Sequence, residues 1–246
     1  MRQMFAGCSK ITSLDVSGFD TGNVTDMYWM FQNCSSIPVI DVSSFDTAKV
    51  TTMSNMFYNC SKLTELDVSG FDTGSVTDMS RMFYGCSKLT ALDVSHFNTR
   101  NVFNMSSMFM GASQLTQIDA SGFDTSQVTN MYAMFTNCSR VTKLDVSGFH
   151  TEKVKNMSYM FAGCSNAAVL DTSTFVTSNV TNMSNMFKNC QKISYLDLSG
   201  FDTGKVTSMD SMFLNCSKLS ALRLGDKTTL QNNCSLRDLP SSDKYT

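Results

Sequence analysis

The sequence predicts a curved α/β solenoid in which each coil holds one short strand and one short helix. Three observations support this prediction. One pattern recurs every 26 residues without insertion, alternating apolar residues open each copy, and apolar residues at helical spacing close it. Repeats of this kind stack so that neighbouring coils bury one continuous core. The phenylalanine that marks the period stands at Phe19, Phe45, Phe71, Phe97, Phe123, Phe149, Phe175 and Phe201.

The opening part of each copy is expected to be a strand. In the third copy, residues 63–88, Leu66 and Val68 alternate with Asp67 and Ser69. This alternation places the two apolar side chains on the inner face. Glycine follows in five of eight copies and marks a turn, after which the FDTxxV stretch is expected to be a second extended segment.

The closing part of each copy is expected to be a short helix. Met79, Met82, Phe83 and Cys86 are spaced i, i+3, i+4 and i+7, which puts them on one helical face. The residue before the first methionine is always Asp, Asn, Thr or Ser, all good N-caps. The residue before the cysteine position is always Gly or Asn, which tolerate the left-handed backbone at a helix end. Helices pack about 10 Å apart and strands about 4.8 Å apart, so the strand side is expected to be concave.

The period also defines the domain organisation. A 26-residue unit lies within the range of leucine-rich repeats, so residues 1–224 are expected to form a leucine-rich-repeat-like solenoid of eight full repeats with partial ends. Residues 225–246 are expected to form a C-terminal exit or capping segment. Met1 and Phe5 fall in register with the repeat, so the chain is expected to begin inside one. The sequence holds no run of 18 apolar residues and no signal-peptide pattern, so neither a membrane span nor a leader is expected in it.

Composition narrows the classes of function. The 246 residues are 42% hydrophobic and 16% charged, which is enough for a sizeable core, and the net charge of −2 offers no basic surface for nucleic acid. The two histidines, His96 and His150, stand where other copies hold Gly or Asp. They suggest neither a nucleophile–base pair nor a metal cluster. We therefore expect no enzymatic activity, no cofactor, no metal and no nucleic-acid partner.

The repeated motif MFxxCxxLTxLDVSxFDTxxVTxM resembles that of the BspA-type leucine-rich-repeat surface proteins of bacteria. The resemblance covers residues 1–224. It implies a cell-surface or secreted protein with a role in adhesion, whose partners would be proteins or glycans of host or neighbouring-cell surfaces. It names no ligand and supplies no catalytic residues.

Eight of the nine cysteines occupy a single repeat position. This position occurs nine times, and its one occurrence without cysteine is Ala112. A position that accepts alanine is expected to hold a small buried side chain, here a free thiol, with a disulfide or metal ligand as the alternative. Cys234 lies outside this row and is the candidate for a reactive thiol. The row consists of Cys8, Cys34, Cys60, Cys86, Cys138, Cys164, Cys190 and Cys216.

Two polar rows recur in every copy and leave alternatives open. The Asp row is either a cation-binding ladder or a set of turn acceptors, and the absence of a GGxGxD pattern favours the acceptors. The Thr row is either an exposed ice-binding array or a set of turn residues, and the absence of TxT favours the turns. The Asp row consists of Asp15, Asp41, Asp67, Asp93, Asp119, Asp145, Asp171 and Asp197. The Thr row consists of Thr21, Thr47, Thr73, Thr99, Thr125, Thr151, Thr177 and Thr203.

Recognition is expected at exposed positions that differ between copies, since the fixed positions build the scaffold. On the strand, the position before the inner leucine varies most, and its predicted binding residues are Ser13, Glu65, Gln117, Lys143 and Tyr195. A second predicted group lies on the helix side and gathers aromatic residues typical of contact surfaces. It consists of Tyr28, Trp29, Tyr58 and Tyr84, with Tyr132 and Tyr159 further along. The alternative is that these aromatics have no partner.

Together these features favour a surface adhesin or ligand-binding module. The main alternative is a structural spacer that holds other domains of a surface protein away from the cell wall. A cation- or ice-binding repeat array is a third and weaker alternative.

Overall fold

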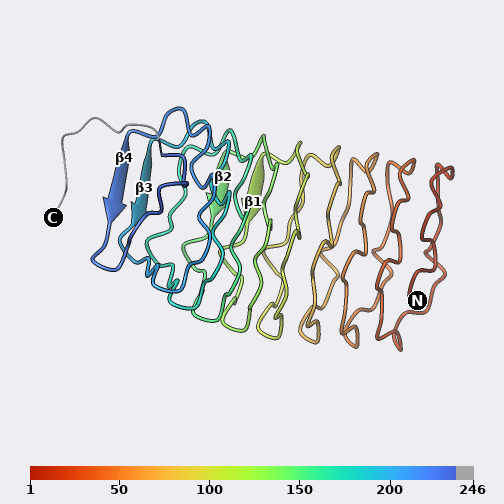
Figure 1. Ribbon diagram of the computed structural model, residues 1–246. Coiled ribbons are helices and arrows are strands. Elements are labelled where there is room, and N and C mark those ends of the chain that lie inside the picture. Colours follow the sequence, from red (N-terminus) through yellow and green to blue (C-terminus); the bar gives the residue numbers. More distant parts are fainter. Residues whose placement is uncertain (237–246) are drawn as a thin grey trace.

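The computed structural model describes residues 1–236 and shows a solenoid whose coils stand side by side, with the first and last described coils at opposite ends of the row (Figure 1). Backbone hydrogen bonds join residues one repeat apart. The amide of Thr51 donates to the carbonyl of Thr25 at 2.9 Å, and that of Thr77 donates to Thr51 at 2.9 Å. The predicted repeat solenoid is therefore confirmed.

The strands are short and parallel. They are β1 (Gln117–Asp119), β2 (Lys143–Asp145), β3 (Tyr195–Leu198) and β4 (Ala221–Leu224). β1 pairs with β2 and β3 with β4, always between residues 26 apart. The inner residues of β1 and β2, Ile118 and Leu144, are buried between exposed neighbours. The predicted strand position and its inward face are thus confirmed in these coils.

The predicted helix is wrong, because residues 1–236 contain no helix. The segment forms two successive four-residue turns instead: the amide of Met30 donates to Met27 at 3.2 Å, and that of Cys34 donates to Phe31 at 3.1 Å. All four residues are buried. Two such turns laid end to end place their first and last residues at i, i+3, i+4 and i+7. The spacing therefore predicted the buried residues correctly and the element wrongly.

The backbone amides of this segment explain why turns replace the helix. In a helix each amide bonds four residues back, whereas here every second amide donates to the carbonyl of the next coil. Stacking therefore satisfies buried backbone groups that a helix would satisfy internally. In one coil these bonds are Met27 to Thr52 (3.2 Å), Trp29 to Ser54 (3.2 Å), Phe31 to Met56 (2.9 Å) and Asn33 to Tyr58 (2.7 Å).

The left-handed backbone predicted at the Gly or Asn position is confirmed in all nine copies, for example at Gly111 (φ 78°) and Asn59 (φ 55°). It lies at the third position of the second turn, as in a type II turn, rather than at a helix end. The third residue of the first turn is left-handed as well, for example Arg81 (φ 54°) and Tyr159 (φ 60°). The capping bond also forms without a helix: Asp78 Oδ1 accepts from the amide of Ser80 at 2.8 Å.

The turn predicted at the glycine position is confirmed, since the amide of Phe71 donates to Val68 at 2.9 Å. A second turn replaces the extended segment predicted over FDTxxV, where the amide of Val76 donates to Thr73 at 3.0 Å. The first and last residues of both turns are buried. Each coil is thus a polygon of turns whose corner residues point inward, and these corners make up the core.

The prediction of a concave strand face assumed helices on the opposite side of each coil, and the described residues contain none. On the turn side the ring centroids of Phe57 and Phe83 lie 5.9 Å apart, and those of Phe83 and Phe109 lie 5.7 Å apart. Helices would need about 10 Å there. The turn side therefore repeats close to strand spacing, and the difference that predicted a concave strand face disappears.

At the C-terminal end, acceptor groups of a shortened segment bind the backbone amides of the last full coil. Ser211 donates to the carbonyl of Asn233 and Phe213 to that of Cys234, both at 2.9 Å, and Met209 donates to Gln231 Oε1 at 3.0 Å. This arrangement suits the capping role predicted for 225–246, of which residues 237–246 lie outside the described part of the chain. Over residues 1–236 there is no helix able to cross a membrane.

Candidate functional site

The variable strand row lies where the sequence placed it. Ser13, Glu65, Gln117, Lys143 and Tyr195 are all exposed. Gln117 opens β1 and is the ladder partner of Lys143 in β2, so neighbouring coils bring neighbouring members of the row together. The structure thus confirms one exposed line of differing side chains, and its role in binding stays a prediction.

Three shallow hollows follow this row, and we call them together the strand-face trough. Their volumes are about 320, 340 and 250 Å³. The first and second share Ala91, and the second and third share Gln117, so the hollows adjoin one another from residue 64 to residue 145. Glu65 and Lys143 lie towards its two ends. Hydroxyls of Thr64, Thr90 and Thr116 and carboxylates of Asp67, Asp93, Asp119 and Asp145 also line it.

The Asp row consists of turn acceptors, as the favoured interpretation predicted. In every copy one carboxylate oxygen accepts the amide of the serine two residues later at 2.9–3.1 Å. In six copies the serine hydroxyl donates to the same oxygen. These bonds lower the pKa of Asp93 and Asp145, the hydroxyl bond having the larger effect. Each carboxylate is therefore engaged in its own turn.

The Thr row is buried, so the ice-binding alternative is wrong. Seven of its members are at most 2% exposed, and each hydroxyl donates to a carbonyl of the next coil at 2.9–3.1 Å. Thr125 donates to the carbonyl of His150 at 2.9 Å and accepts its amide at 2.8 Å. These hydroxyls bond neighbouring coils together and are unavailable to ice.

The cysteine row consists of free thiols, six of them buried. Seven thiols donate to the phenylalanine carbonyl 29 residues earlier at 3.0–3.2 Å. Burial raises the pKa of Cys86 and Cys164 to about 12. Cys234 is also buried, with 5% of its surface exposed. Its placement argues against the reactivity predicted for it.

The predicted aromatic group forms two separate pairs. The rings of Tyr28 and Trp29 stack at 4.7 Å, and those of Tyr58 and Tyr84 stack at 4.5 Å. The guanidinium of Arg2 lies 4.7 Å from the centre of the Tyr28 ring. All four aromatic residues are half-buried rather than fully exposed, so much of each flat face is covered by its stacked neighbour.

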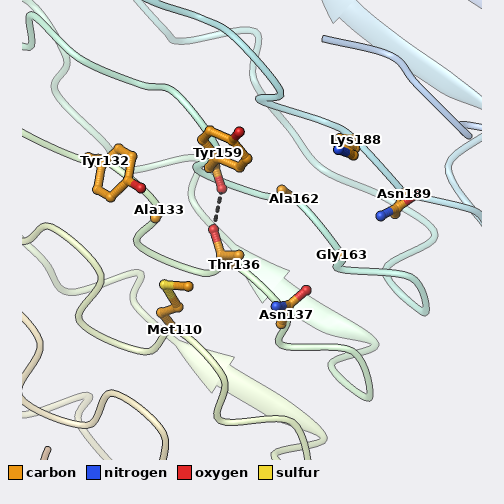
Figure 2. A pocket seen from close by; sticks show the side chains of 10 residues that line it. All are labelled: Met110, Tyr132, Ala133, Thr136, Asn137, Tyr159, Ala162, Gly163, Lys188 and Asn189. Carbon is orange, nitrogen blue, oxygen red and sulfur yellow. Dashed lines mark hydrogen bonds between the residues drawn. The ribbon is translucent and has the colours of Figure 1, made fainter. Parts of the chain in front are cut away.

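A further hollow of about 420 Å³ lies on the turn side of the coils (Figure 2). Tyr132, Tyr159 and Lys188 stand around a floor that includes Thr136 and Ala162. We call it the turn-face hollow. The sequence predicted its tyrosines as contact residues but did not predict a hollow. The missed signal is the pair of small residues, Thr136 and Ala162, in consecutive copies of a row whose flanking copies hold the long side chains Tyr58, Tyr84, Met110, Lys188 and Leu214.

The two histidines each make their own local contact. His96 Nε2 lies 3.0 Å from the carbonyl of Val68, and His150 Nδ1 lies 3.7 Å from Glu152 Oε1. Within residues 1–236 no three His, Cys, Asp or Glu side chains gather into a group able to hold a metal ion.

Crystal structures of bacterial repeat proteins resemble this chain at low sequence identity. A leucine-rich repeat protein from Eubacterium ventriosum is 18% identical over 78% of this chain and 48% of its own, with a TM-score of 0.47. The chain thus spans about half the length of that protein. A leucine-rich cell surface protein from Faecalibacterium prausnitzii is 17% identical over 79% of this chain and 74% of its own, with a TM-score of 0.26. An internalin from Listeria monocytogenes is 10% identical over 85% of this chain and 74% of its own, with a TM-score of 0.28.

One family of sequences covers nearly all of the coils. No curated protein matches the chain. The family described as "Mycoplasma protein of unknown function, DUF285" matches residues 1–68, 63–171 and 140–229. This description differs from the BspA type that the motif resembles. Because the matches extend over the whole solenoid, the chain belongs to the DUF285 family.

Proposed function

We propose that this chain is a non-enzymatic binding module of the bacterial cell surface, which holds a protein or glycan of another surface in the strand-face trough. The observation that supports this proposal most is the variable row lining adjoining hollows over a repeated core. The surface location rests on the resemblance of the repeat to BspA-type proteins.

The trough presents a different chemical group in each coil. Its central row runs from a carboxylate at Glu65 through the small Ala91 and the amide of Gln117 to the ammonium of Lys143. Parallel neighbours lie about 4.8 Å apart, so an extended ligand crossing the coils meets these groups in sequence. The residue after each of these is an inward leucine or isoleucine (Leu66, Leu92, Ile118 and Leu144), so the strand beneath the row varies far less than the row itself. Exposed positions that vary over a nearly uniform scaffold are what a recognition surface requires.

The test is binding of the purified chain to arrays of host matrix proteins and glycans, with and without calcium. A hit should weaken in the triple variant Glu65→Ala, Gln117→Ala, Lys143→Ala. The matched control, Gln127→Ala, Glu152→Ala, Lys153→Ala, removes three exposed side chains of the same kinds from outside the trough. Equal binding by both variants would refute the trough as the site. A requirement for calcium would instead support the alternative that the Asp row binds a cation.

A structural spacer is the second candidate, and one observation favours it. The phenylalanine stack runs unbroken from Phe31 to Phe213 with ring centroids 5.5–5.9 Å apart. Such a continuous core suits a stiff rod. A spacer would lose function in proportion to repeats removed, so deleting residues 63–114, two whole periods, separates the candidates. This deletion also removes half of the trough. Adhesion that falls equally when two repeats outside the trough are deleted would support the spacer, whereas a loss specific to residues 63–114 would support the trough.

A further inference from the structure

We propose that the turn-face hollow is a second binding site, which takes a saccharide unit. It lies on a different side of the coil from the strand-face trough and shares no residue with it. The inference goes beyond the proposed trough function and does not depend on it.

The hollow exists because small residues coincide in adjacent coils. Its floor includes Ala133, Ala162 and Gly163. At the repeat position of Ala162 other coils hold long side chains such as Tyr84, and these would fill the space. Tyr159 and Lys188 rise at the edges (Figure 2). The depression is therefore local to these coils and not a property of the repeat.

The two tyrosines of the hollow differ from the other aromatic pairs in their arrangement. Tyr58 and Tyr84 stack with an angle of 11° between ring planes, so each covers a face of the other. Tyr132 and Tyr159 meet at 68° with centroids 6.1 Å apart. In an edge-to-face pair each ring keeps at least one face free of its partner ring, although both tyrosines are half-buried. Such a phenol ring offers an apolar surface with a polar tip. This is the surface that the C–H face of a sugar ring packs against.

Polar groups without partners surround these rings. Among the described residues, the phenols of Tyr132 and Tyr159, the amide of Asn137 and the ammonium of Lys188 make no hydrogen bond to another side chain or to the backbone. An amide both donates and accepts, and a phenol does too, which matches the neighbouring hydroxyls of a sugar. A phosphate-bearing ligand would call for a cluster of cations, whereas Lys188 is the single basic residue lining the hollow. The mixed aromatic and amide lining therefore fits a saccharide best.

The repeat itself supplies substitutions that preserve the fold. Ala162→Tyr introduces the residue found at the same position in Tyr58 and Tyr84, and it fills the hollow. Tyr159→Asn introduces the residue found at Asn55 and Asn185, and it removes one aromatic wall. Tyr84→Met introduces the residue of Met110 and removes an aromatic outside the hollow, which makes it the matched control.

The experiment is saturation-transfer NMR on the full chain with methyl glycosides of a hexose, an N-acetylhexosamine and a hexuronic acid, followed by titration of any that bind. We expect at least one to bind, Tyr159→Asn to weaken it about tenfold, Ala162→Tyr to abolish it and Tyr84→Met to leave it unchanged. Thermal melting checks that each variant folds. Binding by none of the three sugars overturns the inference, as does binding that both hollow variants retain. A sugar lost instead in the Glu65, Gln117 and Lys143 triple variant would overturn this site while supporting the trough.

Discussion

At the scale of single residues, the coil depends on left-handed backbone positions. Gly111 and Asn59 are suited to a positive φ, but Arg81 and Ser107 adopt it too, with φ of 54° and 55°. An L-residue pays about 1–2 kcal/mol for this conformation. The stack compensates, since the amide of Arg81 donates to the next coil at Ser106 at 2.9 Å. Conformation here follows from neighbouring coils as much as from the residue itself.

Gly111→Ala should therefore destabilise the protein by about 1–2 kcal/mol. A Cβ at Gly111 would meet its nearest neighbour, the Cα of Gly85, at 3.6 Å, so the cost is conformational rather than steric. Gly18→Ala is the matched control, because its φ is not left-handed and a Cβ there meets nothing within 4 Å. Chemical denaturation measures both. Equal stability of the two variants would contradict the assigned backbone strain.

The Asp–Ser turns predict a dependence of stability on pH. Hydroxyl and amide bonds from the serine hold the pKa of Asp93 and Asp145 below the ordinary value of about 3.9. A carboxyl whose pKa is depressed in the folded state contributes stability above the unfolded pKa, and this is lost as pH falls through the folded value. The melting temperature should therefore decrease as the pH is lowered below about 4.

Ser95→Ala with Ser147→Ala should reduce that loss on acidification, because each removes the hydroxyl bond to its carboxylate. Ser75→Ala is the control, since its hydroxyl donates to the carbonyl of Ala48 instead. Melting curves at pH 7 and pH 3 compare them. An acid-induced fall in melting temperature as large in the double variant as in the original chain would refute this origin of the pH dependence.

At the scale of the element, the four-residue turn takes the place of the helix. Sequence patterns predicted which residues are buried, Met79, Met82, Phe83 and Cys86, because two turns and a helical face share one spacing. They could not predict the element, since the choice depends on whether the amide of Met79 bonds within its own coil or to Asn104 in the next. That partner is a property of stacking and not of the segment. The bonds that the Thr row makes to the next coil could not be predicted for the same reason.

Thr125→Val should destabilise the protein by about 1–3 kcal/mol, since it leaves the part-buried amide and carbonyl of His150 without their partner, the buried Thr125 hydroxyl. Thr125→Ser keeps the hydroxyl and loses only a methyl group, so it should cost less. Denaturant titration of the two variants gives the comparison. A valine variant at least as stable as the serine variant would show that the inter-coil bond contributes little.

At the scale of the whole molecule, each coil contacts only its neighbours, so stability accumulates along the row. The exposed strand row from Ser13 to Tyr195 could be predicted from the sequence, because strand alternation fixes the outward positions within one coil. The turn-face hollow could not, because it arises where Thr136 and Ala162 meet across coils. Features within one coil can thus be predicted from a single repeat, whereas features formed between coils can be predicted only when the stacking register is known.

The phenylalanine stack gives the sharpest test of this neighbour-by-neighbour cohesion. Phe109 is fully buried, and its ring lies 5.7 Å from both Phe83 and Phe135. Phe109→Ala should cost about 3–5 kcal/mol, the range for a buried phenylalanine. Phe5 belongs to the first coil, is half-buried, and stacks on the next coil only through Phe31 at 5.6 Å. Phe5→Ala should therefore cost clearly less. Denaturation of both variants compares them, and a loss below about 1 kcal/mol at Phe109 would show that this row is not the core that binds the coils together.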